Sequence, residues 1–208
     1  MLLYAAILLI SYLLGSVSFA IVISKYFYKK DIRDYGSGNA GMTNMLRTFG
    51  KKAAAATFVG DFFKGVLAVF IARQMAAPLD VTTRDICIYI AVGGALLGHL
   101  KPLYFGFKGG KGISVAFGAM MAATPVTTSM AFVMWAIILI ASKMVSLASI
   151  LCVIGYCIFT FIAYNMGYSS VPNVVAGVIF PAVIVYAHRS NIVRIMNGTE
   201  NKIGQKKK

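Results

Sequence analysis

Long apolar runs separated by short polar stretches are the feature that most limits how this chain can fold. A helix needs about 20 mostly apolar residues to cross the hydrocarbon core of a bilayer. Several runs approach that length, so we predict an all-α integral membrane fold, a bundle of seven transmembrane helices. Other runs are shorter, and five or six spans are the alternative if those are re-entrant. The runs are 2–24, 53–72, 86–100, 113–124, 129–142, 146–165 and 173–188.

The amino-acid composition is typical of a membrane protein and not of a soluble one. Of the 208 residues, 59% are hydrophobic and 12% are charged, and the mean hydropathy is +0.79. Soluble domains carry about a quarter charged residues, so this chain has too little polar surface for a soluble shell. We predict one membrane domain, residues 1–195, followed by a basic cytoplasmic tail, residues 196–208. Met1 begins directly in an apolar run, which we interpret as a retained first span and not as a signal peptide.

The positive charges indicate how the spans are oriented. The chain carries 20 Lys and Arg against 6 Asp and Glu, a net charge of +14. If the N-terminus lies outside, 18 of the 20 basic residues fall in or beside inside segments, and only Arg73 and Arg84 fall outside. Because basic residues concentrate in cytoplasmic loops, we predict the N-terminus outside and the C-terminus in the cytoplasm. The inside segments are then 25–52, 101–112, 143–145 and the tail after His188, and the outside turns are 73–85, 124–128 and 165–172.

The same charges limit the choice of partners. They lie between apolar spans and not along one face, so we expect no nucleic-acid partner. Anionic substrates and the head groups of membrane lipids are the partners that such cytoplasmic charges favour. The sequence does not reveal the oligomeric state, and a monomer is the expectation.

The first polar segment, residues 35–47, has the composition of an anion-binding loop. Its glycines let the backbone turn, and successive N–H groups in such a loop can form a nest for an anion. Arg47 adds a cation suited to phosphate, and it shares a face with Thr43 if this part is helical. A flexible polar linker is the competing interpretation. The glycines are Gly36, Gly38 and Gly41, and the neutral donors are Ser37, Asn39, Thr43 and Asn44.

The second polar segment, residues 98–114, places two lysines among glycines just before an apolar helix begins. The N-terminus of a helix has free N–H groups and attracts anions. The segment is not a Walker A loop, because Gly112 and not Ser or Thr follows Lys111. An ordinary positively charged loop would explain the lysines but not the glycines. The residues in question are Gly106, Lys108, Gly109, Gly110, Lys111 and Gly112.

Three ionisable residues lie near the inner ends of apolar runs. His99 has two competing interpretations: a structural histidine, or one that binds phosphate or moves a proton, as its place beside the glycines and lysines favours. Asp61 and Lys64 are three residues apart in one predicted helix. Ionisable groups at membrane depth are costly and usually paired or functional. We therefore predict an intrahelical ion pair that faces the bundle.

A third polar segment, residues 142–149, and a closing cluster, residues 188–191, lie at the inner ends of later runs. Ser146 and Ser149 are three apart at the start of a predicted helix. They are candidates for substrate contact, and an N-cap role for Ser146 is the competing interpretation. The closing cluster holds His188, Arg189 and Asn191, for which an ordinary positively charged helix end is the alternative.

Several catalytic patterns are absent from the sequence. There is no His and Cys cluster for a metal, no Gly-x-Ser-x-Gly elbow, and no His-x4-Asp pair, because Tyr104 is the fifth residue after His99. With only six acidic residues, a pair of catalytic carboxylates is not expected. We expect no metal and no cofactor. A site rich in cations and donors suits an anion with several phosphate oxygens.

Together these motifs resemble those of the bacterial acyl-phosphate-dependent glycerol-3-phosphate acyltransferases, the PlsY family. The resemblance extends to about residue 195 and rests on the whole set, since each motif alone is weak. The set is Gly15-Ser16 with Phe19; Gly36-Ser37-Gly38-Asn39 with Gly41, Thr43-Asn44 and Arg47; Asp61-Phe62-Phe63-Lys64-Gly65; Gly98-His99 with Pro102; Gly106-Phe107-Lys108-Gly109-Gly110-Lys111-Gly112; Ser146-Leu147-Ala148-Ser149; and His188-Arg189 with Asn191.

The resemblance implies a multi-pass enzyme of the bacterial cytoplasmic (inner) membrane, with seven helices, the N-terminus outside and the active site facing the cytoplasm. Such an enzyme transfers a fatty acyl group from acyl phosphate to the 1-hydroxyl of glycerol 3-phosphate. The products are lysophosphatidic acid and inorganic phosphate, in the first step of phospholipid biosynthesis. It uses neither acyl-CoA nor an acyl carrier protein thioester.

The resemblance also assigns the site residues. We expect Ser37, His99 and Asn191 to be catalytic. We expect the phosphate of glycerol 3-phosphate to be held by Arg47, Ser37 and Lys108, with His99. We expect the acyl phosphate to contact Lys111 and the 109–112 backbone, with Gly41 and Thr43. His188 and Asn191 are expected to orient the reacting end. Asn39, Gly109, Gly110, Ser146, Ser149 and Arg189 complete the expected substrate contacts. Either His99 or a substrate phosphate accepts the hydroxyl proton.

Two other functions compete with acyl transfer. A transporter for a phosphorylated solute would also use polar loops and a basic inner face, although no inverted repeat is visible in the sequence. A lipid-binding scaffold without catalysis would tolerate simultaneous changes at Ser37, Arg47 and Lys108.

Overall fold

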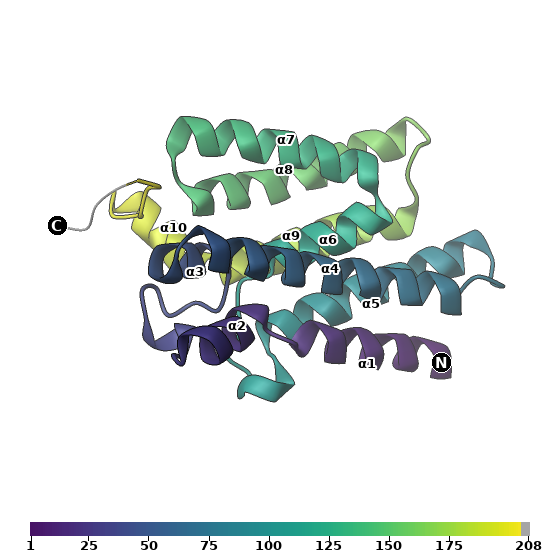
Figure 1. Cartoon of the computed structure of the whole chain (residues 1–208). Helices are drawn as coiled ribbons and strands as arrows, with labels where there is room; N and C mark the ends of the chain where they lie inside the picture. Colours follow the sequence, from purple (N-terminus) through teal and green to yellow (C-terminus); the bar gives the residue numbers. More distant parts are fainter. Residues whose placement is uncertain (205–208) are drawn as a thin grey trace. The chain divides into compact units, whose positions relative to one another are not determined.

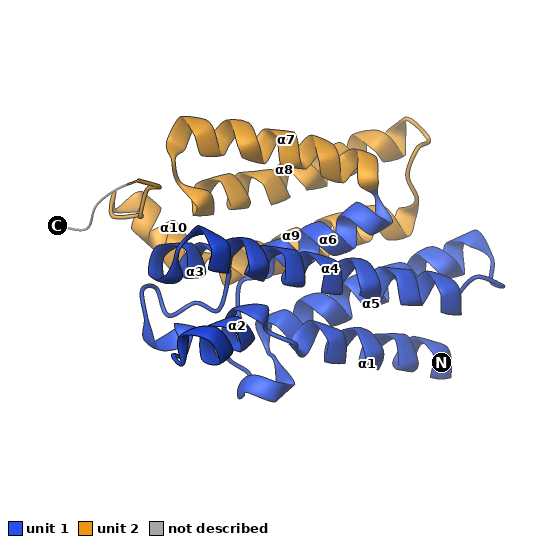
Figure 2. Cartoon of the chain, viewed as in Figure 1, with its two compact units in different colours: residues 1–124 blue, residues 125–208 orange. Residues whose placement is uncertain are grey.

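The computed structural model describes residues 1–204, and the regular structure in this part of the chain is helical (Figure 1). The chain divides into two compact units, the first ending at Thr124 and the second beginning at Pro125 (Figure 2). The first unit contains α1 (Leu2–Ser16), α2 (Phe19–Tyr28), η1 (Ile32–Asp34), α3 (Met42–Phe49), α4 (Lys51–Met75), α5 (Val81–Leu100), η2 (Leu103–Phe105) and α6 (Ile113–Ala123). The second contains α7 (Pro125–Ser142), α8 (Val145–Asn165), α9 (Val171–Ala187) and α10 (Arg189–Met196).

Each of the seven predicted apolar runs is mostly helical, but the helices differ in length. Five stretches are long and apolar enough to cross a membrane: Leu2–Tyr28, Lys51–Met75, Val81–Phe105, Pro125–Ser142 and Val145–Asn165. The pair α9 and α10, bent by 63°, makes a sixth if it counts as one span. Helix α6 has 11 residues, or about 16 Å, against a hydrocarbon thickness of about 30 Å. The helical membrane fold is confirmed at this level, and the count of seven spans stays a prediction.

The first span is broken where the sequence predicts one continuous helix. Val17 and Ser18, between α1 and α2, have extended backbone conformations with ψ of 105° and 100°. In an unbroken helix the Val17 carbonyl would accept a bond from the residue four positions later. Here it accepts a hydrogen bond from Lys64 Nζ on α4, at 2.6 Å. The break is therefore stabilised by a residue of another helix.

The ends of two other helices also differ from the prediction. Helix α5 begins at Val81 and not at residue 86, because Asp80 caps it: Asp80 Oδ1 accepts a hydrogen bond from the Thr83 N–H at 3.0 Å. The predicted outside turn 124–128 is wrong, since α7 begins at Pro125. Proline suits the first position of a helix, because its fixed φ is helical and its missing N–H would have no partner there.

Helices α1 and α5 pack with their backbones in close contact. Gly94 and Gly98, four residues apart on α5, face α1, and Gly15 of α1 faces Ala95. A Cβ added to Gly98 would lie 2.7 Å from the Ser16 amide nitrogen. Small residues at this spacing let membrane helices approach closely. The contact fixes the position of His99, the next residue of α5, against the end of α1.

We predict that Gly98→Ala destabilises the protein, because the new methyl group has no space between the two backbones. Overpacking of this kind costs about 1–3 kcal/mol. The measurement is the unfolding temperature in detergent, with Leu97→Ala as the control, because Leu97 is half-exposed on the same helix. An equal effect of the two substitutions would contradict the prediction.

In the second unit, helix α10 was not expected from the sequence, which ended the last span at residue 188. The predicted tail, 196–208, is described as far as residue 204, where the Ile203 N–H donates to the Lys143 carbonyl at 2.8 Å. Lys206, Lys207 and Lys208 lie outside the described residues.

Candidate functional site

The first and second polar segments meet at one end of the first unit, beside His99. The Gly110 N–H donates a hydrogen bond to the His99 carbonyl at 3.1 Å. A Cβ added to Gly110 would collide with His99 Nε2 and would lie 2.6 Å from the Ala40 carbonyl oxygen. Segments about 70 residues apart in the sequence thus flank one imidazole ring.

The first polar segment is shaped by Asn44, which is buried. Its Nδ2 donates to the carbonyls of Ile32 (3.2 Å) and Tyr35 (2.9 Å), and its Oδ1 accepts from the Ser37 N–H (2.9 Å). Asn44, predicted as a donor for a ligand, is instead committed to the loop itself. The predicted helix that carries Thr43 and Arg47 is confirmed as α3, and both Ser37 and Arg47 are exposed.

The second polar segment turns sharply before α6. Gly106 and Phe107 adopt left-handed backbone conformations with φ of 67° and 57°, and the Phe107 N–H donates to the Pro102 carbonyl at 3.0 Å. Gly112, with φ of 89°, is the residue before α6. Lys108 is exposed and Lys111 half-buried. The prediction that this loop leads into a helix N-terminus is confirmed.

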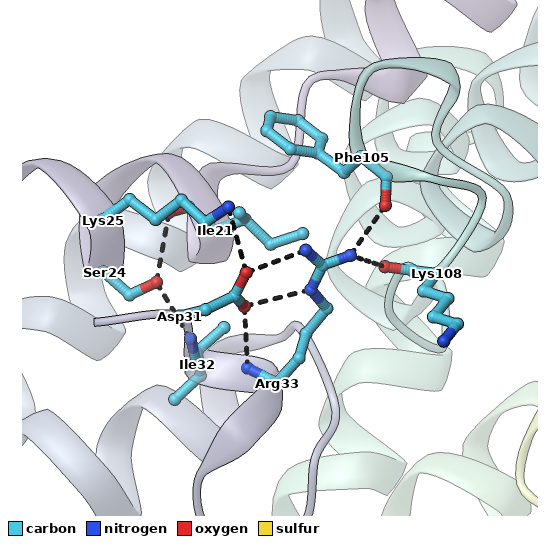
Figure 3. Close-up of polar contacts among 8 residues, drawn as sticks. All are labelled: Ile21, Ser24, Lys25, Asp31, Ile32, Arg33, Phe105 and Lys108. Carbon is cyan, nitrogen blue, oxygen red and sulfur yellow. Dashed lines mark hydrogen bonds and ion pairs between the residues drawn. The ribbon is translucent and has the colours of Figure 1, made fainter. Parts of the chain in front are cut away.

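Arg33, on η1 just before the first polar segment, connects this part of the chain to the second polar segment (Figure 3). Its Nη1 donates to the carbonyls of Phe105 (2.7 Å) and Lys108 (3.4 Å), while Nε and Nη2 bind both oxygens of Asp31 at 3.0 and 2.8 Å. Lys25 Nζ lies 3.1 Å from Asp31 Oδ2. The hydrogen bonds from Arg33 hold the pKa of Asp31 well below its usual range, and Asp31 in turn raises the pKa of Arg33. We call this arrangement of Asp31, Arg33 and the two carbonyls the Arg33 bridge.

A groove of about 700 Å³ opens beside the Arg33 bridge. Gly38 of the first polar segment and Lys108 and Gly109 of the second line it, and Ser37 and Arg47 are not among its lining residues. The other lining residues are Lys25, Asp31, Arg33, Asp34, Tyr104, Phe105 and Gly106. The groove therefore presents both positive and negative side chains around two of the predicted substrate-binding residues.

Beneath the loops, Asp61, Lys64 and His99 form a buried cluster. Lys64 Nζ lies 2.8 Å from Asp61 Oδ1 and 3.0 Å from His99 Nδ1. The predicted ion pair between Asp61 and Lys64 is confirmed. The sequence did not indicate that His99 joins it. All three side chains are at most 5% exposed. An unpaired charge in such a buried position would be costly.

In the second unit, Ser146 is not the N-cap of α8. That position belongs to Met144, and the Ser146 hydroxyl is buried without a hydrogen-bond partner among the described residues. The Ser149 hydroxyl accepts from Trp135 Nε1 at 3.3 Å. Helix α8 begins at Val145, so Ser146 is its second residue, whereas an N-cap at Ser146 would require the helix to begin at Leu147.

The closing cluster is tied to Glu200, which the sequence analysis assigned to the tail. Asn191 Nδ2 donates to both Glu200 oxygens at 3.2 Å, and Arg194 Nε donates to Oε2 at 2.9 Å. His188 Nδ1 lies 2.8 Å from the Ile184 carbonyl oxygen, which can only accept, so this nitrogen carries a proton. Arg189 is exposed, with its guanidinium 4.7 Å from the Tyr186 ring centre.

Comparison with known protein families decides to which group these features belong. The family model described as glycerol-3-phosphate acyltransferase matches residues 5–198. The chain belongs to the glycerol-3-phosphate acyltransferase family. The resemblance inferred from the polar segments is thereby confirmed.

Individual members of the glycerol-3-phosphate acyltransferase family match nearly the whole chain. The enzyme of Clostridioides difficile (strain 630) is 41% identical over 98% of this chain and 97% of its own length. That of Neisseria meningitidis serogroup B is 41% identical over 94% of each. Crystal structures of PlsY (YgiH), an integral membrane glycerol 3-phosphate acyltransferase, are 35% identical over 97% of this chain. Their TM-scores are 0.86 for the glycerol 3-phosphate form, with 96% of its chain covered, and 0.83 for the lysophosphatidic acid form, with 95% covered.

Proposed function

We propose that this acyltransferase moves a fatty acyl group from acyl phosphate to the 1-hydroxyl of glycerol 3-phosphate. The hydroxyl oxygen bonds to the acyl carbon, the bond from that carbon to the phosphate oxygen breaks, and the products are lysophosphatidic acid and inorganic phosphate. Membership of the family supports glycerol 3-phosphate as acceptor, as do the solved neighbours named for their glycerol 3-phosphate and lysophosphatidic acid forms.

The choice of acyl phosphate as the acyl donor rests on one observation: two glycine-rich cationic segments meet at His99. Two phosphate-bearing substrates would need two anion-binding loops side by side, and the contact among Ala40, His99 and Gly110 brings two such loops together. Acyl phosphate is already an activated anhydride. The protein then needs chiefly to position the reactants and stabilise charge, a task for backbone N–H groups and fixed cations.

The residue roles within this proposal follow the sequence motifs. Ser37, Arg47 and Lys108, with His99, hold the phosphate of glycerol 3-phosphate. Lys111 and the 109–112 backbone, with Gly41 and Thr43, meet the acyl phosphate, and Asn39 supports the first segment. In the second unit, His188 and Asn191 orient the reacting end, and the further substrate contacts are Ser146, Ser149 and Arg189. The exposure of Ser37, Arg47 and Lys108 supports a role in binding from solution.

Location in the bacterial cytoplasmic membrane, with seven spans, the N-terminus outside and the site facing the cytoplasm, is part of the same proposal. The distribution of 18 of 20 basic residues supports it. Labelling of intact cells with a membrane-impermeant thiol reagent tests it: Thr82→Cys should react and Lys101→Cys should not. The reverse pattern would contradict this orientation.

The direct test of the reaction uses purified protein and palmitoyl phosphate, with and without glycerol 3-phosphate. Phosphate release that depends on glycerol 3-phosphate and yields lysophosphatidic acid is the expected result. Conversion in detergent would also separate the enzyme from a transporter, which needs a sealed compartment. Folded protein in lipid that releases no phosphate under these conditions would overturn the choice of donor.

Replacing Arg47 with alanine should raise the KM for glycerol 3-phosphate while kcat changes less, because a charged hydrogen bond to the bound phosphate is lost. Such bonds contribute about 1.5–3 kcal/mol, which corresponds to a rise of about 10- to 100-fold. Steady-state kinetics at saturating acyl phosphate measure it. Arg73→Ala is the control, since Arg73 lies in the last turn of α4, at the end of that helix predicted to be outside. An unchanged KM in the Arg47 variant would remove Arg47 from the phosphate site.

A further inference from the structure

Lys64 contacts three different groups from one buried ammonium. Its Nζ donates to the Val17 carbonyl (2.6 Å), lies 3.0 Å from His99 Nδ1, and forms an ion pair with Asp61 Oδ1 (2.8 Å). The Asp61 contact is an ion pair and not an aligned hydrogen bond. The aligned N–H groups of Lys64 are therefore directed at the helix break and at the imidazole.

This geometry sets which nitrogen of His99 carries a proton. An ammonium group has donors and no acceptor, so a hydrogen bond between Lys64 and His99 requires Nδ1 to accept. The neutral ring must then be protonated on Nε2. The opposite arrangement would need Nδ1–H to donate to Asp61, but Asp61 Oδ1 is 3.6 Å away, beyond hydrogen-bond distance.

The Nε2 edge of the ring faces the place where the two polar segments meet. A Cβ added to Gly110 would collide with Nε2 and would lie 2.6 Å from the Ala40 carbonyl oxygen, so both atoms border the same space. The hydrogen bond from the Gly110 N–H to the His99 carbonyl holds the loop to the same residue. Because Gly110 has no side chain, Nε2 faces the space between the two predicted anion-binding segments.

We propose that Asp61 and Lys64 are positioning residues that hold His99 as a neutral hydrogen-bond donor, with Nε2–H directed at an oxygen of a bound substrate. The identity of that substrate rests on the proposed function, whereas the tautomer does not. A ring already protonated on Nε2 cannot take the hydroxyl proton there. A second proton would also remove the acceptor that the His99 ring offers to Lys64 and would place two cations side by side in a buried cluster. Of the two proton acceptors that the sequence leaves open, His99 is disfavoured.

The tautomer can be measured directly by ¹⁵N NMR of detergent-solubilised protein labelled at the histidine rings. The chain has two histidines, and His188, with its proton on Nδ1, supplies the opposite signature in the same spectrum. A His188→Gln variant assigns the signals. We expect His99 to be protonated on Nε2 only at neutral pH. A proton on Nδ1, or on both nitrogens, would overturn the proposal whether or not the protein is active.

The donor role is tested by two replacements of His99. The glutamine side chain can place an N–H donor near the position of Nε2, whereas asparagine places its amide near Nδ1. We expect kcat to fall by about 100-fold or more in His99→Asn, as when one preorganised donor is removed, and to be at least partly restored in His99→Gln. Equal losses in the two variants would overturn the donor role.

The positioning role is tested by removing both charges together, in Asp61→Asn with Lys64→Met, so that no charge is left buried alone. We expect the His99 spectrum to change to a mixture of tautomers and kcat to fall while the KM for glycerol 3-phosphate changes little. A purely structural pair would leave the tautomer fixed, and that result would overturn the proposal. If wild-type protein shows no acyl transfer, the proposed function fails, and the NMR result still decides the tautomer.

Discussion

Replacing Gly110 with alanine should reduce kcat/KM for glycerol 3-phosphate acylation by about 100-fold or more. The added methyl group would collide with His99 Nε2 and lie 2.6 Å from the Ala40 carbonyl, so either the ring or the loop must move. Lys108 and Lys111 belong to the same loop and would move with it. A displacement of about 1 Å among reacting groups can cost 100-fold in rate. Steady-state kinetics on the purified variant measure the loss.

The matched control is Gly106→Ala in the same loop. Gly106 has a left-handed φ of 67°, but no atom lies within 4 Å of an added Cβ. Its cost is backbone strain of about 1–2 kcal/mol, without displacement of His99. Unfolding temperatures of both variants confirm that they are folded. If Gly110→Ala were no more impaired than Gly106→Ala, the close contact between Gly110 and the imidazole would have no part in catalysis.

Hydropathy predicts the helices of this chain well because each apolar run must bury or screen its backbone polar groups in a bilayer. It does not predict their breaks. The gap at Val17 depends on Lys64, 47 residues later in the chain, which donates to the Val17 carbonyl. The early start of α5 depends on one cap by Asp80. An average over about 20 residues does not register a single hydrogen bond of either kind.

The candidate site, like the fold, could be predicted from the sequence only in part. The glycines and cations of the polar segments are local in sequence, so motif composition indicates them. The contacts that hold them are not local: Arg33 reaches Phe105, and Lys64 reaches His99. The presence of Asp31 two residues before Arg33, in a chain with six acidic residues, was a signal that the sequence analysis did not use. Glu200 was assigned to the basic tail, but it is buried against Asn191 and Arg194, and motif composition does not indicate these contacts either.

We expect the Arg33 bridge to stay intact over the physiological pH range, because the hydrogen bonds from Arg33 lower the pKa of Asp31. A carboxyl group whose pKa is lower in the folded state contributes stability above its unfolded value, about 3.9, and loses it as the pH falls through the folded value. The folded pKa of Asp31 lies well below the usual range. Unfolding temperatures between pH 5 and pH 8 should therefore show no change from protonation of Asp31.

Arg33→Ala should raise the KM for glycerol 3-phosphate by about tenfold or more, because the carbonyls of Phe105 and Lys108 lose their shared donor and the loop that carries Lys108 is no longer held to the first segment. Arg33→Lys should restore little, since one ammonium cannot bind both Asp31 oxygens and reach the loop as the planar guanidinium does.

Lys25→Ala is the matched control for the Arg33 variant. Lys25 pairs with the same carboxylate but, among the described residues, makes no hydrogen bond or ion pair to the second polar segment. Its side chain is 54% exposed, and exposed ion pairs contribute about 0–1 kcal/mol. We expect its KM to stay near the wild-type value. A folded Arg33→Ala protein with the same KM as Lys25→Ala would show that the bridge does not position Lys108, and that the loop holds its conformation through the hydrogen bond between Gly110 and His99.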